Sequence, residues 1–277
     1  MNNLSNYKTE KIFERLLKNK TSTNYWNYVT ELRTRKTEDI YKRSVQLTKS
    51  KNLKEKILGI TILAQFGHPR LHKKEIVNIL FDLLSTETDY KIISSLLYAI
   101  GHNNEKLNKK QIELLCSFGN HKSAKVRFSL TSALLGVEKE TAIDTQIKLS
   151  SDKDSDIRNW ATFGIGTQIE IDNQKIRTAL WQRINDTDFE TKSEAIVGLA
   201  NRKDEKIKDV IISELKNEND GTLLLEAILT LNDKDFLPLL NRNLKKARKD
   251  KEDITKEWIS ALEETIRELK GTPHNKG

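Results

Sequence analysis

The sequence predicts an all-α fold, a right-handed α-solenoid of about six to eight antiparallel helix pairs that ends in a capping helix. The composition, an internal repeat and the spacing of apolar residues support this prediction. The chain has 277 residues, of which 36% are apolar and 32% charged, and it contains only 11 Gly and 3 Pro. That is too little turn chemistry for an all-β protein, and it is typical of helices joined by short polar loops.

The internal repeat is clearest in the second half of the chain. Residues 152–166 align with residues 186–200 at a fixed offset of 34, and both Asp pairs, a basic residue, an Ala and a Gly coincide. Each copy leads into a second apolar segment, at 175–184 and 206–215. Self-similarity at a fixed period of this length predicts a repeat architecture in which each unit packs on its neighbours.

The repeated segments have helical spacing. The first copy places apolar residues at i, i+3, i+4, i+7 and i+8, which predicts one buried helix face made of Ile157, Trp160, Ala161, Gly164 and Ile165. The paired Asp residues precede this helix, where a side-chain oxygen caps free N–H groups. Gly164 and Gly198 lie on the buried face, which predicts a close approach of two helices.

Weaker copies extend the repeat in both directions. They predict helix pairs at 58–84, 91–118, 125–149 and 223–244, with one or two degenerate pairs in residues 8–49. The expected ends of the first helices recur at spacings of 34, 35, 30, 34 and 32, at Gly67, Gly101, Gly136, Gly166, Ala200 and Asn232. Gly and Asn are the residues that a left-handed C-cap prefers. We therefore predict a single solenoid domain over 1–277, with degenerate helices at 1–50, repeats at 51–249, a capping helix at 252–270 and a tail at 271–277.

The Asp-x-Asp-x-x-Ile-Arg start at 152–158, the Ala-x-x-Gly-hydrophobic-Gly end at 161–166 and the period of about 34 residues resemble HEAT repeats. The resemblance covers 152–216 well and 57–150 fairly. In HEAT proteins the basic residue after the Asp turn tends to form an Asp–Arg ladder between neighbouring repeats. The resemblance implies such a structural role for Asp154, Asp188, Arg127, Arg158 and Lys192.

The charge is distributed unevenly along the chain. The net charge is +8, and residues 1–56 alone hold 14 Lys+Arg against 6 Asp+Glu, so the remaining residues are neutral overall. Aromatic and basic residues in this segment suit phosphate contacts and base stacking. The candidates for nucleic-acid binding are Trp26, Tyr28, Arg33, Arg35, Lys36, Lys42 and Arg43. The alternative is a degenerate first repeat, in which Trp26 and Tyr28 pack inward and the charges are solvated.

A second candidate site comes from the expected geometry of a solenoid. If the second helix of each pair lines the concave side, the polar residues on those helices form a groove for a partner protein. The residues predicted to line it are Lys175, Arg177, Arg183, Lys208 and Arg242.

The sequence contains no complete motif for a metal site, a phosphate site or a catalytic nucleophile. The five histidines lack Cys or carboxylate partners at metal-ligand spacing, and the Asp152-x-Asp154-x-Asp156 run has Ile157 where a calcium loop needs Gly. We find no phosphate loop and no nucleophile motif. We therefore expect no enzyme activity, no metal and no cofactor. An N-terminus without an apolar core and the lack of an apolar span of about 20 residues predict a cytoplasmic protein without membrane contact.

Three functions remain. The first is a non-catalytic scaffold or adaptor that binds a partner protein through the concave groove. The second is nucleic-acid binding of the HEAT-like DNA repair type through the basic, aromatic N-terminal region, and a glycosylase is its remote catalytic form. The third is an inhibitor of one target, such as a toxin-immunity protein, although complementarity to a basic nuclease toxin would favour a more acidic chain.

Overall fold

A computed structural model describes residues 4–217, 221–249 and 256–271. In these ranges the chain forms sixteen α-helices and three short 3-10 helices, and no residue lies in a strand. The α-helices are α1 (Thr9–Lys18), α2 (Ser22–Arg35), α3 (Glu38–Thr48), α4 (Leu53–Ala64), α5 (Lys73–Thr86), α6 (Tyr90–Gly101), α7 (Lys109–Cys116), α8 (Ala124–Ala133), α9 (Glu140–Leu149), α10 (Ser155–Gly166), α11 (Gln174–Arg183), α12 (Phe189–Asn201), α13 (Ile207–Lys216), α14 (Thr222–Leu231), α15 (Leu237–Ala247) and α16 (Lys256–Leu269). The 3-10 helices are η1 (Leu4–Asn6), η2 (Ser117–Asn120) and η3 (Lys234–Phe236).

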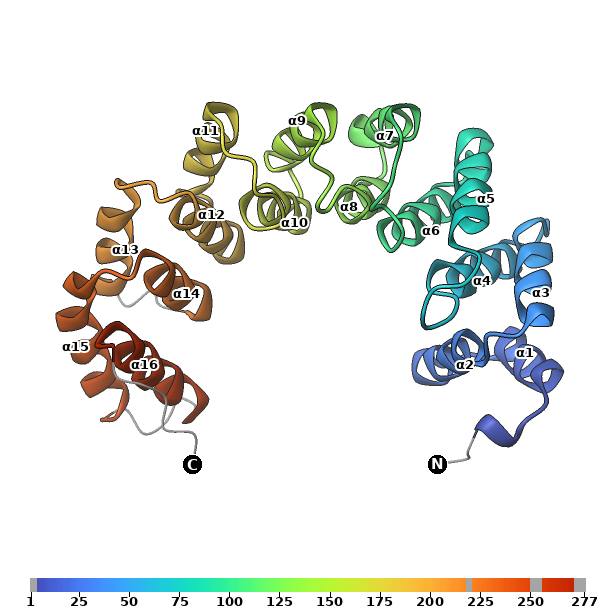
Figure 1. Cartoon of the computed structure of the whole chain (residues 1–277), viewed down its shortest axis with the longest axis horizontal. Coiled ribbons are helices and arrows are strands. Elements are labelled where there is room, and N and C mark those ends of the chain that lie inside the picture. The colour runs from blue at the N-terminus through green and yellow to red at the C-terminus, as the bar shows by residue number, and fades with distance from the viewer. Residues whose placement is uncertain (1–3, 218–220, 250–255, 272–277) are drawn as a thin grey trace. The chain divides into compact units, whose positions relative to one another are not determined.

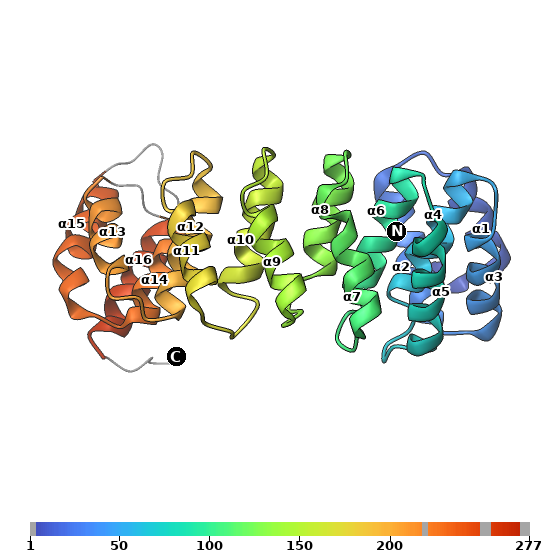
Figure 2. The ribbon, with the colours of Figure 1, turned by 90° about the horizontal axis from the view of Figure 1, so that it is seen from above.

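The chain divides into two compact units, an N-terminal unit of residues 1–145 and a C-terminal unit of residues 146–277, with α9 across the boundary. In the N-terminal unit α2, α4, α6 and α8 contact one another in turn, and α1, α3, α5 and α7 pack against this row. In the C-terminal unit α10, α12, α14 and α16 make the same kind of row, with α11, α13 and α15 against it. Each unit is therefore two layers deep, with an even-numbered row and an odd-numbered row (Figures 1 and 2).

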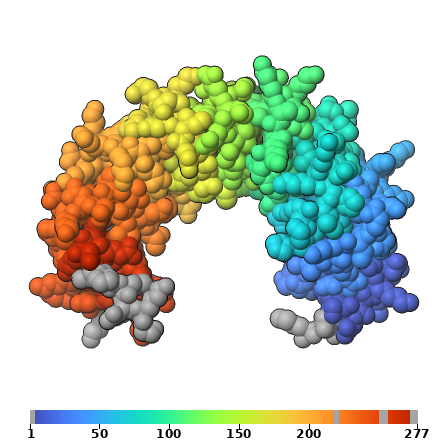
Figure 3. All heavy atoms as spheres, viewed as in Figure 1, coloured from blue at the N-terminus to red at the C-terminus, as the bar shows by residue number. Residues whose placement is uncertain are grey.

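The core of each unit lies between its two rows. The predicted buried positions Ile157, Ala161 and Ile165 are at most 1% exposed, as are Ile176 and Leu180 of the facing helix. These residues recur every three to four positions, so they form one apolar face on each helix. Side chains fill the space that the ribbons leave open, as the space-filling view shows (Figure 3).

The prediction for Trp160 is wrong. The sequence places it on the buried face of α10, but 40% of its surface is exposed, because the neighbouring position Ala161 takes the core side. Residues at i+3 and i+4 lie on either side of a helical face, so Trp160 lies at the edge of the buried face of α10 and Ala161 within it.

The close approach predicted for Gly198 occurs in the C-terminal unit, but its partner is Gly166 instead of Gly164. A Cβ atom added to Gly198 would lie 2.7 Å from the Cα atom of Gly166 and 3.1 Å from both methyl groups of Leu180. Glycine is therefore required at Gly198 by the contact between α10 and α12, because no other residue avoids this overlap.

Left-handed backbone occurs at some of the predicted helix ends. Asn232 is a left-handed C-cap of α14, and Gly67 and Gly136 have positive φ in the turns that follow α4 and α8. Gly101 and Gly166 instead remain helical as the last residues of α6 and α10. A Cβ atom at Gly101 would lie 2.8 Å from the carbonyl oxygen of Ser132, so close packing explains glycine there.

The pairing of helices differs from the predicted one. The Asp turn at 184–188 joins α11 to α12, and α11 packs on α12 more extensively than on α10, the partner that the repeat predicts. The predicted second helices α11, α13 and α15 then form the odd-numbered row, which lies on the outer side of the bend within the C-terminal unit (Figure 1). The expectation that they line the concave side is wrong, because a repeat in sequence fixes the period but not which helix begins the pair.

Both ends of the chain are helical. Residues 8–49, predicted as one or two degenerate pairs, form α1, α2 and α3, with Ile12, Phe13 and Leu32 fully buried. The predicted capping helix is α16, which packs on α14 and α15 and is the second helix of the last pair. The predicted cap residues 252–255 and the tail residues 272–277 lie outside the described residues.

Candidate functional site

The residues predicted to line a groove lie on α11, α13 and α15, and Arg177 and Lys208 tie neighbouring segments together. The guanidinium of Arg177 donates to Asp172 at 2.7 and 2.8 Å and to Asp204 at 3.0 Å. The ammonium of Lys208 lies 2.6 Å from a carboxylate oxygen of Asp233 and 2.6 Å from one of Asp235.

Arg183 and Arg242 have similar structural contacts. Arg183 donates to Asp186 at 3.2 Å, and Arg242 donates to the carbonyl oxygen of Leu215 at 2.8 Å. Lys175 is exposed on the first turn of α11. Cations that are already held by carboxylates or carbonyls across helix pairs are poor anchors for a partner.

Arg158, for which the resemblance implies a role between repeats, is bound to the following Asp turn. Its guanidinium donates to both carboxylate oxygens of Asp186 at 2.8 and 2.9 Å, and to the carbonyl oxygen of Asp152 at 3.0 Å. The Asp186 side chain is only 5% exposed, and these hydrogen bonds together with the cation lower its pKa against the opposing effect of burial. This bidentate pair joins two successive Asp turns.

The other residues to which the resemblance gives a ladder role make contacts of different kinds. Asp154 and Asp188 are N-caps, whose carboxylates accept from the backbone N–H of Asp156 and Thr191. Lys192 connects α12 to α13 through Glu214, at 2.7 Å. Arg127 is buried and donates to the carbonyl oxygen of His121 at 2.8 Å.

The basic N-terminal candidates are largely structural. Arg33 donates to Gln65 and to the carbonyl oxygen of Thr61, and burial lowers its pKa to about 10. Arg35 donates to Glu31 and to the carbonyl oxygen of Leu4.

The remaining cations of this set differ in exposure. Arg43 lies over the ring of Phe13, and Lys36 donates to the carbonyl oxygen of His68. Lys42 is exposed, 3.9 Å from Glu38. Trp26 is exposed and Tyr28 half-buried, so the alternative in which both aromatic rings pack inward is wrong for Trp26.

Exposed aromatic rings concentrate on the even-numbered rows. Six large hydrophobic side chains are exposed in the described residues, and all except Leu17 lie on even-numbered helices. The five are Trp26 (51%) on α2, Tyr90 (42%) and Tyr98 (39%) on α6, Trp160 (40%) on α10 and Phe189 (51%) on α12. Sequence reasoning missed this feature; the available signal was a second apolar stripe, such as Trp160 and Phe163, on a helix that already has a buried face.

The second residue of several even-numbered helices is charged, and its sign differs between the two units. In the N-terminal unit the second residue of α4, α6 and α8 is an exposed lysine: Lys54, Lys91 and Lys125. In the C-terminal unit the second residues of α10 and α12 are the exposed acids Asp156 and Glu190.

The C-terminal unit also contains a perturbed carboxyl group on the same row. Burial of Glu194 on α12, with Glu226 and Glu190 nearby, raises its pKa to about 7. One of its carboxylate oxygens is buried and has no hydrogen-bond partner. Groups with perturbed pKa values are frequent at functional sites, since a ligand of the right charge relieves the cost.

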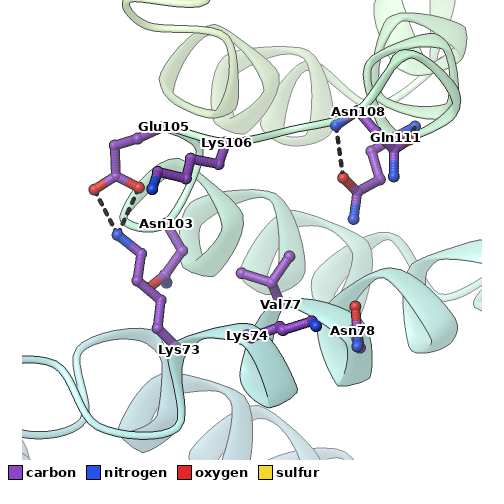
Figure 4. Close-up of a pocket in the computed structure, with 9 residues that line it drawn as sticks. All are labelled: Lys73, Lys74, Val77, Asn78, Asn103, Glu105, Lys106, Asn108 and Gln111. Atoms are coloured by element: carbon purple, nitrogen blue, oxygen red, sulfur yellow. Dashed lines mark hydrogen bonds and ion pairs between the residues drawn. The ribbon is translucent and has the colours of Figure 1, made fainter.

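A hollow of about 680 Å³ lies in the N-terminal unit, between α5 and the segment that leads into α7 (Figure 4). Lys73 spans its edge, with its ammonium 2.7 Å from both carboxylate oxygens of Glu105. Asn103 donates to two backbone carbonyls, and Asn108 forms a capping box with Gln111. These polar groups serve the fold, and neither histidine nor cysteine lines the hollow.

The described residues contain neither a candidate metal site nor a candidate membrane span. No group of three or more His, Cys, Asp or Glu residues is placed to hold a metal ion within 4–217, 221–249 and 256–271. Over the same ranges, no helix has the length and apolar character that crossing a membrane requires.

Comparison with known proteins supports the architecture. The X-ray structure of YibA from Escherichia coli matches 96% of this chain and 94% of its own, with a TM-score of 0.72 and 26% identity. This chain is an α-helical repeat protein with a solenoid fold.

Two further comparisons extend this result. In sequence, Protein YibA of Escherichia coli strain K12 is 27% identical over 235 residues, which are 84% of each protein. An engineered protein matches 92% of this chain and 77% of its own, with a TM-score of 0.50 and 16% identity, which concerns the fold alone. No protein-family model matches the sequence.

Proposed function

We propose that this chain is a non-catalytic repeat protein of the HEAT type that binds a partner protein through the solvent side of its even-numbered rows. The observation that carries the proposal is the placement of the exposed aromatic rings, five of which lie on these rows. Single exposed apolar residues are ordinary, but their concentration on one layer is typical of a protein interface.

In the C-terminal unit the charges favour a protein over a nucleic acid. Asp156, Glu190, Glu194 and Glu226 lie on the even-numbered row of the C-terminal unit and would repel a phosphate backbone. In the N-terminal unit, Arg33 and Arg35 are engaged with the protein itself. An inhibitor or immunity protein is one form of the proposed function, since it also acts by binding one protein.

A photo-crosslinking experiment tests this proposal. A benzophenone amino acid replaces Tyr98 or Trp160 on the even-numbered rows, and Lys110 or Gln182 on the odd-numbered rows as matched exposed controls. We expect protein adducts in the source cells from the first pair of positions and none from the controls. Adducts to nucleic acid alone, or adducts confined to Lys110 and Gln182, would refute the proposal.

A further inference from the structure

The even-numbered row of the C-terminal unit has a surface with distinct chemistry, which we call the acidic–aromatic face. It consists of Trp160 and Phe163 on α10, Phe189, Glu190 and Glu194 on α12, and Glu226 on α14. The rings of Trp160 and Phe163 meet edge to face, with their centroids 5.8 Å apart. The Phe189 ring lies beside Gly221 at the start of α14, 3.4 Å from where a Cβ atom would be.

Burial and two neighbouring carboxylates raise the pKa of Glu194 in this face. Glu226 and Glu190 both oppose ionisation of Glu194, whose inner oxygen is buried without a partner. Three carboxyl groups beside exposed rings make a surface that is short of positive charge.

The nearby cations are already engaged elsewhere. On α10, Arg158 is bound to Asp186, and on α12 the ammonium of Lys192 lies 2.7 Å from Glu214 of α13. Asp156, at the start of α10, adds a further negative charge. Helix α14 has no basic residue in its sequence.

We propose that the acidic–aromatic face binds an extended segment of a partner protein that carries arginine or lysine, with the cation over the Trp160 ring and with Glu194 and Glu226 as its counter-ions. Cations bind aromatic faces and carboxylates together, and such rings with basic partners are frequent interface anchors. This inference rests on the proposed function and names the chemistry of the partner.

Charge complementarity decides among the possible occupants. A nucleic acid or an acidic segment would add negative charge beside Glu190, Glu194 and Glu226. A second copy of the same face would do likewise, because a two-fold interface brings identical patches together. A basic segment alone relieves the repulsion among these carboxylates.

The test measures fluorescence anisotropy of a labelled nine-residue peptide of alternating arginine and leucine, with the full-length chain at pH 8 and low salt. A peptide of alternating glutamate and leucine is the charge control. We expect saturable binding of the arginine peptide only, weakened at least about fivefold by Trp160→Ala and by the pair Glu194→Gln with Glu226→Gln. Trp160→Phe, which keeps a ring, retains most of the affinity.

Matched variants separate the face from general electrostatics. Glu205→Gln removes an exposed carboxylate of the same unit that lies outside the face, and we expect it to leave the affinity unchanged. A urea midpoint equal to that of the native chain shows that each variant is folded. Equal weakening by Glu205→Gln, or equal binding of the glutamate peptide, would overturn the inference.

The pH dependence gives a second readout. A bound cation favours the ionised form of Glu194, so we expect the affinity for the arginine peptide to rise with pH. Because the pKa of Glu194 is about 7, the rise between pH 6 and pH 8 is up to about tenfold. Glu194→Gln removes this rise. An affinity that does not change with pH in the native chain would count against Glu194 as a counter-ion.

Crosslinking and peptide binding distinguish the two proposals. If Trp160 crosslinks to a partner protein but the arginine peptide does not bind, the inference on partner chemistry fails and the proposed function stands. If neither even-numbered position crosslinks to a protein, the proposed function fails.

Discussion

Replacement of Gly198 by alanine tests the contact that sets the spacing of α10 and α12. The new Cβ atom would lie 2.7 Å from the Cα atom of Gly166, which is backbone and cannot rotate away. Overpacking typically costs about 1–3 kcal/mol, and a clash with backbone belongs to the upper part of that range, about 2–3 kcal/mol, from which the better helix propensity of alanine returns about 1 kcal/mol. We therefore expect Gly198→Ala to lower the free energy of unfolding by about 1–2 kcal/mol.

Urea unfolding monitored by circular dichroism measures this loss. Asn201→Ala, at the exposed end of the same helix, is the control and is expected to shift the free energy by less than about 0.5 kcal/mol. A second variant, Leu180→Ala, removes the methyl groups that lie 3.1 Å from the added atom. If the obstacle is the backbone of Gly166, as we argue, the double variant gains no relief. A Gly198→Ala chain as stable as the native one would refute the reasoning.

Three further predictions concern single charged side chains, each checked by urea unfolding. Glu194→Gln should stabilise the chain at pH 8 but not near pH 4.5. The raised pKa of Glu194 means that its ionisation destabilises the native state as the pH rises from about 4.5 to about 7. Because the carboxyl is only partly buried, we expect the gain in the free energy of unfolding at pH 8 to be about 1 kcal/mol. Equal effects at both pH values would contradict this. Arg158→Ala should cost about 2–3 kcal/mol at pH 7 by leaving Asp186 underpaired. The lowered pKa of Asp186 makes its contribution present above the normal carboxyl range and lost as the pH falls through the folded pKa, so the cost should shrink below about pH 4. Arg202→Lys should cost about 2 kcal/mol, because the planar guanidinium donates to the carbonyl oxygens of Gly166, Ile165 and Ile171 and an ammonium cannot reach all three; a change below about 0.5 kcal/mol would show that these bonds contribute little.

The contacts of Arg158 show which part of a link between repeats a local sequence pattern predicts. The Asp turn and the basic residue after it carry the resemblance to HEAT repeats, and that resemblance implies a role between repeats for Arg158. They do not identify Asp186 as its partner, since Asp188 caps α12 and only the folded turn shows which carboxylate faces the guanidinium.

The sequence by itself determined the helical repeat, its period and most helix boundaries, because apolar spacing and Asp caps are local signals that each helix carries within itself. It also predicted the close approach at Gly198. Only the tertiary structure decided which helix of each pair forms the even-numbered row. In the folded chain Trp160 is exposed, and cations of α11 and α13 bind carboxylates of neighbouring segments. The exposure of a side chain depends on which neighbours cover its helix and not on the residues of the helix alone.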